Sequence, residues 1–279
     1  LNTFLNAMTY PDKTVYPVAS CNEKDFQNLM DVYMDAVLHP NIYKHEEIFR
    51  QEGWNYHLEE ADGELSYNGV VYNEMKGAFS SPDGVLDRMI LNSLFPDTTY
   101  ANESGGDPDV IPELTYEEYL NFHRTYYHPS NSYIYLYGNM DMEEKLAFLD
   151  EHYLSHFDYL DVDSVIQEQK AFGACRDVTL EYPVAENEGE EDNTYLSYNM
   201  VVGNAADSQM AMAFEVLDYA LLSAPGAPLK QALLDVKAGK DVYGSYDDGI
   251  LQPYFTVIAK GSNPDKKEEF VSVIRQVLG

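Results

Sequence analysis

Cysteine is scarce in this sequence. Only two of the 279 residues are cysteines, Cys21 and Cys175, and they lie far apart in unrelated contexts. Disulfide-stapled domains carry closely spaced cysteines, and a cysteine-rich zinc site needs more than two of them. The sequence therefore excludes both classes. Two unpaired structural thiols fit a reducing compartment and hence an intracellular protein.

Basic residues are also few. The chain has 17 lysines and arginines against 48 aspartates and glutamates, which gives a formal net charge of −31. Nucleic acid is disfavoured as a partner, because neutralising phosphates requires clustered Lys and Arg. Two explanations of the acidity stay open at this point. An acidic cavity could concentrate cationic peptides, or the charge could only keep the surface soluble.

Long apolar runs are absent as well. No stretch approaches the roughly 18 apolar residues of a membrane-spanning helix, so we expect no membrane partner. The sequence opens at Leu1 with LNTFLNAMTYPDKT, which has neither an initiator Met nor the apolar core of a signal peptide. We expect the natural protein to continue upstream. Hydrophobic residues make up 45% of the chain, enough for a substantial core.

Common catalytic motifs are missing too. No G-x-S-x-G elbow, Walker loop or dinucleotide glycine fingerprint occurs, so serine or cysteine nucleophile chemistry has no support. HYLSH places His152 and His156 four residues apart, a spacing by which two imidazoles on one helix can hold zinc. A peptidase also needs a glutamate to activate water, and none lies between them. An exposed helix end explains this pair better.

The order of predicted elements indicates an α+β fold in two consecutive units. We expect two layered α/β sandwich units, each a mainly antiparallel sheet packed with helices, over residues 1–160 and 161–279. Two capping boxes are predicted, at Ser20/Glu23 and at Thr115/Glu118. The elements expected in the first unit are strands over 3–9 and 14–20, helices over 23–38, 44–54, 69–79, 85–95, 116–127 and 142–157, and a buried strand over 132–138.

The second unit follows the same coarse plan. An acidic loop over 185–193 is expected to be solvated. The elements expected around it are a segment over 176–184, strands over 194–202, 241–247 and 254–260, helices over 208–222 and 227–234, and a closing helix from Lys266. The shared plan suggests structural duplication, with the second unit incomplete at its C-terminus, although no residue-level repeat is visible.

One helix carries an acid where it should be apolar. If NGVVYNEMKGAF is helical, Glu74 lies in the middle of an apolar face, four residues after Val70 and four before Ala78. An ionised carboxylate there is costly unless a cation meets it. A buried salt bridge or a metal ligand would each account for it. Glu52, in RQEGW, is another helical acid.

The ordered segments LNTFLNAMTYPDKTVYPVAS, DFQNLMDVYMDAVLHP, QEGW, GVVYNEMKGAF, LFPDTTY, SGGDP, IPELT and FHRTYYHPSNSYIYLYGN resemble a known family. Together they resemble the presequence protease branch of the pitrilysin/insulinase-type zinc metallopeptidases. The resemblance covers nearly all of residues 1–140. It continues more weakly through APLKQALLD, DVYGSYDDG and QPYFTVIAKG.

The resemblance implies roles for four residues. The family's metal-binding glutamate falls on Glu74, which would be the third protein ligand of zinc beside two histidines. Glu52 matches the family's supporting acid and would orient the site. Asn6 and Ala7, in the family's edge strand, would meet the substrate backbone as an extended peptide adds a strand. Presequence-type substrates are basic, which adds weight to the cationic-peptide explanation of the acidity.

The family's H-x-x-E-H motif, which supplies two histidines and the general base, occurs nowhere in the sequence. We therefore expect a fragment of the first half of a zinc oligopeptidase, inactive alone and binding zinc poorly. Its partners would be the missing N-terminal segment, the C-terminal half and peptide substrates. The parent would be cytoplasmic in a bacterium, and mitochondrial or plastid in eukaryotic relatives. A non-catalytic, structural or peptide-holding relative of the same fold is the alternative.

Overall fold

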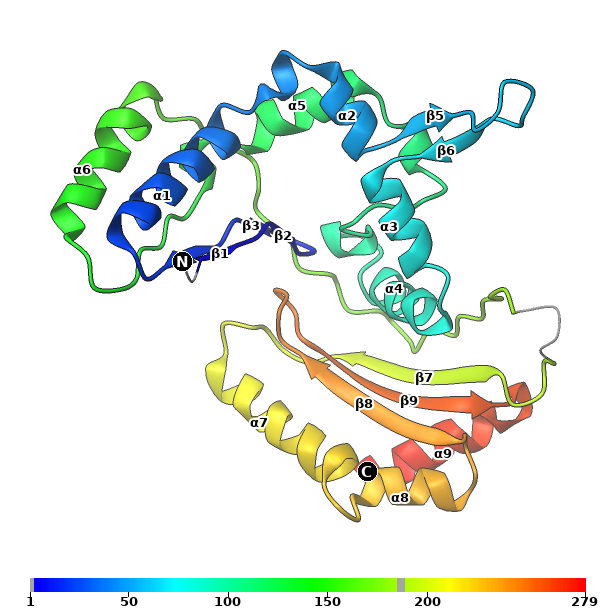
Figure 1. Ribbon diagram of the computed structural model, residues 1–279. Helices are drawn as coiled ribbons and strands as arrows, with labels where there is room; N and C mark the ends of the chain where they lie inside the picture. The colour runs from blue at the N-terminus through cyan, green and yellow to red at the C-terminus, as the bar shows by residue number, and fades with distance from the viewer. Residues whose placement is uncertain (1–2, 185–188) are drawn as a thin grey trace. The chain divides into compact units, whose positions relative to one another are not determined.

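The computed structural model describes residues 3–184 and 189–279, so residues 185–188 of the predicted acidic loop lie outside the described residues. The chain divides into two compact units (Figure 1). One unit comprises residues 1–78 and 103–165, and the other comprises residues 79–102 and 166–279. Residues 79–102 thus group with the second unit rather than the first. The domain boundary at residue 160 stays a prediction.

The first unit combines helices with two-stranded antiparallel ladders, which pair β1 with β4, β2 with β3, and β5 with β6. Its elements are β1 (Thr3–Leu5), β2 (Met8–Thr9), β3 (Thr14–Val15), β4 (Val18–Ser20), α1 (Glu23–Leu38), α2 (Glu46–Glu52), β5 (Asn55–His57), β6 (Ser66–Asn68), α3 (Val70–Ala78), α5 (Tyr116–Tyr126) and α6 (Met142–His152). The predicted hairpin of residues 3–20 forms, with each long strand interrupted once.

One of the two predicted helix caps is wrong. Helix α1 is capped by Asn22, whose side chain accepts a hydrogen bond from the Asp25 amide at 2.9 Å. The hydroxyl of Ser20 instead donates to the Asp25 carboxylate at 2.6 Å. Asn caps a helix as well as Ser does, and here it lies next to the first helical residue. The box of Thr115 and Glu118 at the start of α5 is confirmed, with both reciprocal hydrogen bonds present.

Residues 132–138 do not form the predicted buried strand. SYIYLYG pairs with no strand in the described part of the chain, and Tyr133, Tyr135 and Tyr137 are 104%, 83% and 83% exposed. Their alternation with the half-buried Leu136 is that of a strand. A ladder nevertheless needs a neighbouring strand to accept its hydrogen bonds. The pattern identifies the two faces of the segment but not its burial.

The second unit is a three-stranded antiparallel sheet, in the order β7-β9-β8, with helices beside it. Its elements are α4 (Pro82–Leu94), β7 (Thr194–Val201), α7 (Ser208–Asp218), a π-helical turn (Tyr219–Ser223), α8 (Pro228–Asp235), β8 (Asp241–Asp247), β9 (Tyr254–Ser262) and α9 (Lys267–Leu278). The strands and helices predicted for residues 194–279 are present. The segment 176–184 has no regular structure.

The central strand β9 divides the core of this unit in two. Phe255, Val257 and Ala259 pack in the larger cluster, with side chains of α8 and α9. Ile258 points to the opposite face, where it joins Ile90 of α4 in a second cluster. Figure 1 shows α7, α8 and α9 along one face of the sheet and α4 beside the other. Because side chains alternate along a strand, one strand supplies both clusters.

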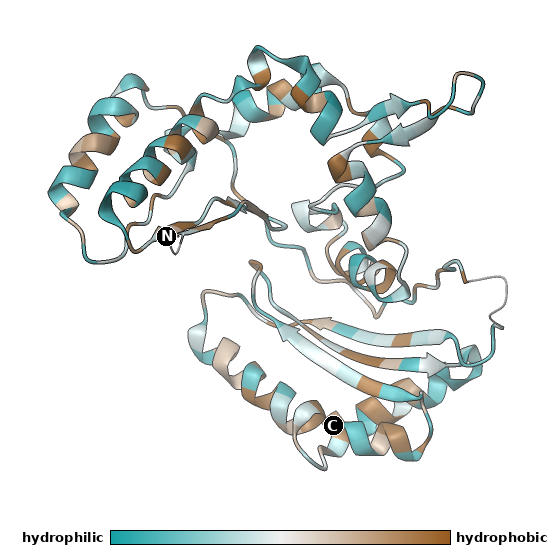
Figure 2. Cartoon of the chain, viewed as in Figure 1, coloured by the Kyte–Doolittle hydropathy of each residue, from teal (hydrophilic) through white to brown (hydrophobic). Residues whose placement is uncertain are grey.

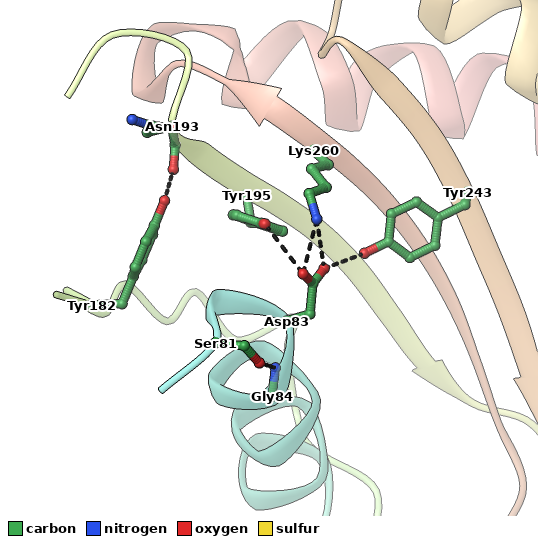
Figure 3. Close-up of polar contacts among 8 residues, drawn as sticks. All are labelled: Ser81, Asp83, Gly84, Tyr182, Asn193, Tyr195, Tyr243 and Lys260. Carbon is green, nitrogen blue, oxygen red and sulfur yellow. Dashed lines mark hydrogen bonds and ion pairs between the residues drawn. The ribbon is translucent and has the colours of Figure 1, made fainter. Parts of the chain in front are cut away.

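An ion pair holds the start of α4 to this sheet (Figure 3). The Asp83 carboxylate accepts hydrogen bonds from the Lys260 ammonium of β9 at 2.8 and 3.2 Å and from the Tyr243 hydroxyl of β8 at 3.2 Å. The hydrogen bond from Lys260 is the main cause that lowers the pKa of Asp83. Burial, with the Asp83 charge adding to it, raises the pKa of Tyr243 to about 12. The contact ties residues 79–102 to the second unit.

Candidate functional site

Two glycines bring the end of α2 against the start of α3. Gly69 has φ of +151°, and a Cβ there would lie 2.2 Å from the Gly53 carbonyl oxygen. That same carbonyl accepts a hydrogen bond from the Tyr72 amide at 3.3 Å. A side chain at Gly69 would therefore force the two backbones apart. The helices that carry Glu52 and Glu74 meet at this close approach, which the sequence reading missed.

Helix α3 forms as predicted, but Glu74 is not buried. Tyr72 and Met75 pack against the core of Phe49, Trp54 and Ile111. Glu74 lies on the other side of the helix and is exposed, as is its neighbour four residues before, Val70, at 44%. The expected burial of Glu74 is wrong in this structure, because no described residue covers that face. Burial therefore gives no reason for a cation at Glu74, and its role as a metal ligand stays a prediction.

A glycine-rich loop supports the inner face of α3. A Cβ at Gly105 would fall 2.3 Å from the Met75 sulfur, so the SGGDP loop packs directly on this helix. Gly106 has φ of +94°, a conformation that glycine adopts without strain. From its composition, SGGDP is predicted only to be a turn-rich loop. Two adjacent glycines were the signal for a close packing contact.

Glu52, the last residue of α2, is exposed and accepts a hydrogen bond from the Gln51 side chain at 3.2 Å. Burial raises the pKa of the Tyr119 phenol of α5, and the charges of Tyr127 and Glu52 add to the shift. Glu52 therefore lies close enough to α5 for its charge to act there. Its supporting role toward Glu74 is untested.

A complete metal centre is not present in the described residues. Within 3–184 and 189–279, no group of three or more His, Cys, Asp or Glu side chains is placed to hold a metal ion. His152 and His156 lie at the end of α6 and in the following 3₁₀ turn. Glu74 supplies one carboxylate, whereas a catalytic zinc ion takes three protein ligands. Glu74 alone does not make a zinc site.

Asn6 and Ala7 lie exposed between β1 and β2. The Asn6 amide donates to the Pro17 carbonyl at 3.1 Å, so this amide points into the hairpin. Ala7 lies between β1 and β2, in neither strand, so its amide is not part of the ladder. The Asn6 side-chain oxygen accepts from this amide at 2.9 Å. Ala7 could receive an added strand through its main chain, and Asn6 only through its side chain.

The family follows from the comparison with known proteins. A model described as the peptidase M16 inactive domain matches residues 113–279. The chain belongs to the M16 peptidase family. It is 57% identical over 278 residues to Protein HypA of Clostridium perfringens, covering all of this chain and 29% of that protein. It is 42% identical over 282 residues to Presequence protease 1, chloroplastic/mitochondrial, of Arabidopsis thaliana, covering all of this chain and 26% of that protein. The presequence protease resemblance is thereby confirmed.

Two solved structures share the fold. An M16-like peptidase from Alicyclobacillus acidocaldarius superposes with a TM-score of 0.61 at 17% identity, covering 99% of this chain and 60% of that one. A protease from Helicobacter pylori gives 0.61 at 16% identity, covering 99% and 62%. At these identities the likeness concerns the fold alone, and it confirms the predicted α+β class. The chain spans less than a third of the length of its curated relatives.

Among the described helices, none has the length and apolar character that crossing a membrane requires.

Proposed function

We propose that this chain is the part of a zinc-dependent oligopeptidase that carries one metal ligand, and that the complete protein hydrolyses unfolded, presequence-like peptides. The match to presequence proteases along the whole chain is the observation that carries this proposal. The expected intracellular location goes with it, since several relatives are named as mitochondrial or chloroplastic proteins.

Glu74 is the proposed ligand. Carboxylate oxygen is a common zinc ligand in proteins. Glu74 lies on α3, which packs on the core of its unit through its own Tyr72 and Met75 side chains. Glu52 supports the site from α2, across the Gly53–Gly69 approach. Zinc, when bound, would supply a Lewis acid. The remaining ligands and the general base would come from residues beyond this sequence, so the chain alone neither binds zinc tightly nor hydrolyses peptides.

The acidic character of the chain fits the proposed substrates. A formal charge of −31 attracts cationic peptides at long range and repels anionic ones. An extended peptide would add as a strand at Ala7, where hydrogen bonds form between main chains and do not depend on the side chains of the peptide. Broad sequence specificity follows from that mode of binding.

The test is a comparison of the natural full-length protein with its Glu74→Gln variant. Amide for carboxylate keeps the shape and removes the charge that holds a cation. We expect zinc content to fall and peptide hydrolysis to drop at least about 100-fold. The matched control is Glu143→Gln on the exposed surface of α6, which should leave both unchanged. Full zinc content and activity in Glu74→Gln would refute the ligand role. A tight stoichiometric zinc site in this chain alone would refute the expectation that the chain binds zinc poorly by itself.

A peptide-holding relative without catalysis is the second candidate. The observation that favours it is the description of the matching family model as an inactive domain. That match begins at residue 113, however, and so does not reach Glu52 or Glu74. The gene sequence upstream of Leu1 separates the two candidates. An intact H-x-x-E-H there supports the peptidase, and a degraded motif supports the holding protein.

A further inference from the structure

The hairpin of β5 and β6 leaves one of its faces uncovered. Tyr56 and Tyr67 are directly paired across the ladder, and their rings lie 5.5 Å apart. They are 64% and 44% exposed, and the flanking Leu58 and Leu65 are 45% and 68% exposed. Cross-strand partners and residues two apart share a face of a ladder. We call these four residues the hairpin face.

The hairpin face rests on a fixed base. The Trp54 ring lies 5.5 Å from Tyr56 and 5.9 Å from Tyr67, with edge-on geometry to both. Trp54 is only 8% exposed, and its indole nitrogen donates to the Leu114 carbonyl at 2.9 Å. Such edge-on aromatic pairs are favourable beyond the area they bury. The exposed tyrosines are therefore anchored rather than loose, which lowers the entropy cost of binding a partner.

The loop that joins the two strands is acidic. It reads LEEADGEL and carries Glu59, Glu60, Asp62 and Glu64 with no lysine or arginine. All four side chains are exposed, and none has an ion-pair partner among the described residues. Figure 2 shows the loop as largely hydrophilic, at the end of a hairpin that projects from α2 and α3. Four uncompensated charges thus lie beside an exposed apolar face.

We propose that the hairpin face docks a cationic amphipathic peptide segment. The apolar side chains of the peptide would lie on the two tyrosines and two leucines, and its lysines and arginines would meet the four loop carboxylates. Charge complementarity selects this occupant. A second copy of the chain would bring like-charged loops together on molecules of charge −31. Nucleic acid and anionic lipid are repelled for the same reason.

The hairpin face contains neither Glu52 nor Glu74, and docking on it does not rest on the proposed hydrolysis. Docking needs neither zinc nor the H-x-x-E-H motif, so an uncleaved peptide measures it in the chain as it stands. Failure of docking would leave the zinc proposal intact, and loss of zinc binding would leave docking intact.

The chain carries its own probe for the test. Trp54 is the only tryptophan in the sequence and touches both hairpin tyrosines. The ligand is a helical peptide of about 15 residues, or four turns, built from Lys, Arg, Leu and Ala, with apolar residues on one face. The same peptide with Glu in place of Lys and Arg is the charge control. We expect saturable change in Trp54 emission with the basic peptide only, weakening as salt rises.

Two variants locate the binding. Glu59→Gln, Glu60→Gln, Asp62→Asn and Glu64→Gln combined should weaken binding about tenfold or more, because the paired charges are lost. The matched control removes four exposed charges from the same unit, away from the hairpin, and should stay within about twofold. It combines Glu143→Gln, Asp150→Asn, Glu151→Gln and Asp158→Asn.

Tyr56→Ser with Tyr67→Ser tests the apolar part and should also weaken binding about tenfold, provided circular dichroism shows an intact fold. Three results would overturn the proposal. These are equal weakening by the two charge sets, equal binding of the acidic peptide, or a Trp54 change that depends on protein concentration without any peptide. The last result would mean that a second copy covers the hairpin face.

Discussion

Replacing Asp83 should loosen the attachment of α4 to the sheet of the second unit. Its carboxylate accepts two hydrogen bonds from Lys260 and one from Tyr243, and the Tyr195 hydroxyl lies at 3.5 Å (Figure 3). Asp83→Asn keeps the shape and one acceptor oxygen but removes the charge. Lys260 then has no ion-pair partner among the described residues.

The expected loss is modest because the pair is half in solvent. The side chains of Asp83 and Lys260 are 47% and 43% exposed. An exposed pair contributes about 0.2–1 kcal/mol, and each hydrogen bond to a carboxylate adds about 1 kcal/mol before solvent screening. We expect Asp83→Asn to lower the free energy of unfolding of the second unit by about 1–2 kcal/mol.

The effect should depend on pH in a defined direction. The pKa of Asp83 is lowered in the folded protein, chiefly by the hydrogen bond from Lys260. A carboxyl with a lowered pKa binds fewer protons folded than unfolded, so its stabilisation is present above the unfolded value, about 3.9, and disappears as pH falls through the folded value. The difference in unfolding free energy between wild type and Asp83→Asn should be constant from about pH 5 to 8, because this range lies above the pKa of Asp83 in both the folded and the unfolded protein. It should shrink in acid below about pH 4.

Urea unfolding followed by circular dichroism measures this difference. The control is Asp87→Asn, one helical turn later on α4, where burial and the Asp83 charge raise the pKa of the carboxyl. Removing that charge should leave stability unchanged or slightly higher at pH 7. Equal destabilisation by Asp83→Asn and Asp87→Asn would refute the ion pair as the cause. So would a difference for Asp83→Asn that grows in acid.

Three further tests address other parts of the structure. Gly69→Ala should lower the stability of the first unit by about 3 kcal/mol in urea unfolding, whereas Gly77→Ala, whose Cβ meets nothing within 4 Å, should raise it by up to about 1 kcal/mol. Asn6→Ala should free the Ala7 amide and tighten calorimetric binding of an extended peptide up to about fivefold. Weaker binding would contradict the blocking of the Ala7 amide by Asn6 and would favour direct contact of the Asn6 side chain with the peptide. Thr115→Ala should cost about 1 kcal/mol in thermal denaturation, and no change would contradict the cap.

Local signals in the sequence predicted local structure well. The helix at 116–126 was located from its capping box, and both hydrogen bonds of that box are present. Strands β7, β8 and β9 lie where strands are predicted over 194–202, 241–247 and 254–260. In each case the information lies within a few residues, and the partners that satisfy the backbone lie in the same unit. The cap at α1 failed only because Asn22 competed with Ser20 for one role.

Signals that depend on distant partners were less informative. SYIYLYG is a run of aromatic and aliphatic residues, and the segment 176–184 alternates apolar and polar residues, yet neither pairs with a strand in the described chain. β9 is itself a largely apolar run, but β7 and β8 flank it on both sides, and it is buried. A repeat of two residues along the sequence shows which side chains lie on the same face of a strand. It does not state whether a second strand is there to pair with it.

The same distinction applies to the candidate site. Helical spacing correctly put Glu74 between Val70 and Ala78, but it could not tell which of the two apolar faces of α3 meets the core. Tyr72 and Met75 fill the buried face, which leaves the Glu74 face open. An exposed carboxylate carries no desolvation cost, so its metal role depends on what binds to that face rather than on strain within this chain. Zinc content of the Glu74→Gln variant is therefore a more direct test than any stability measurement, because removing an exposed charge should leave folding nearly unchanged.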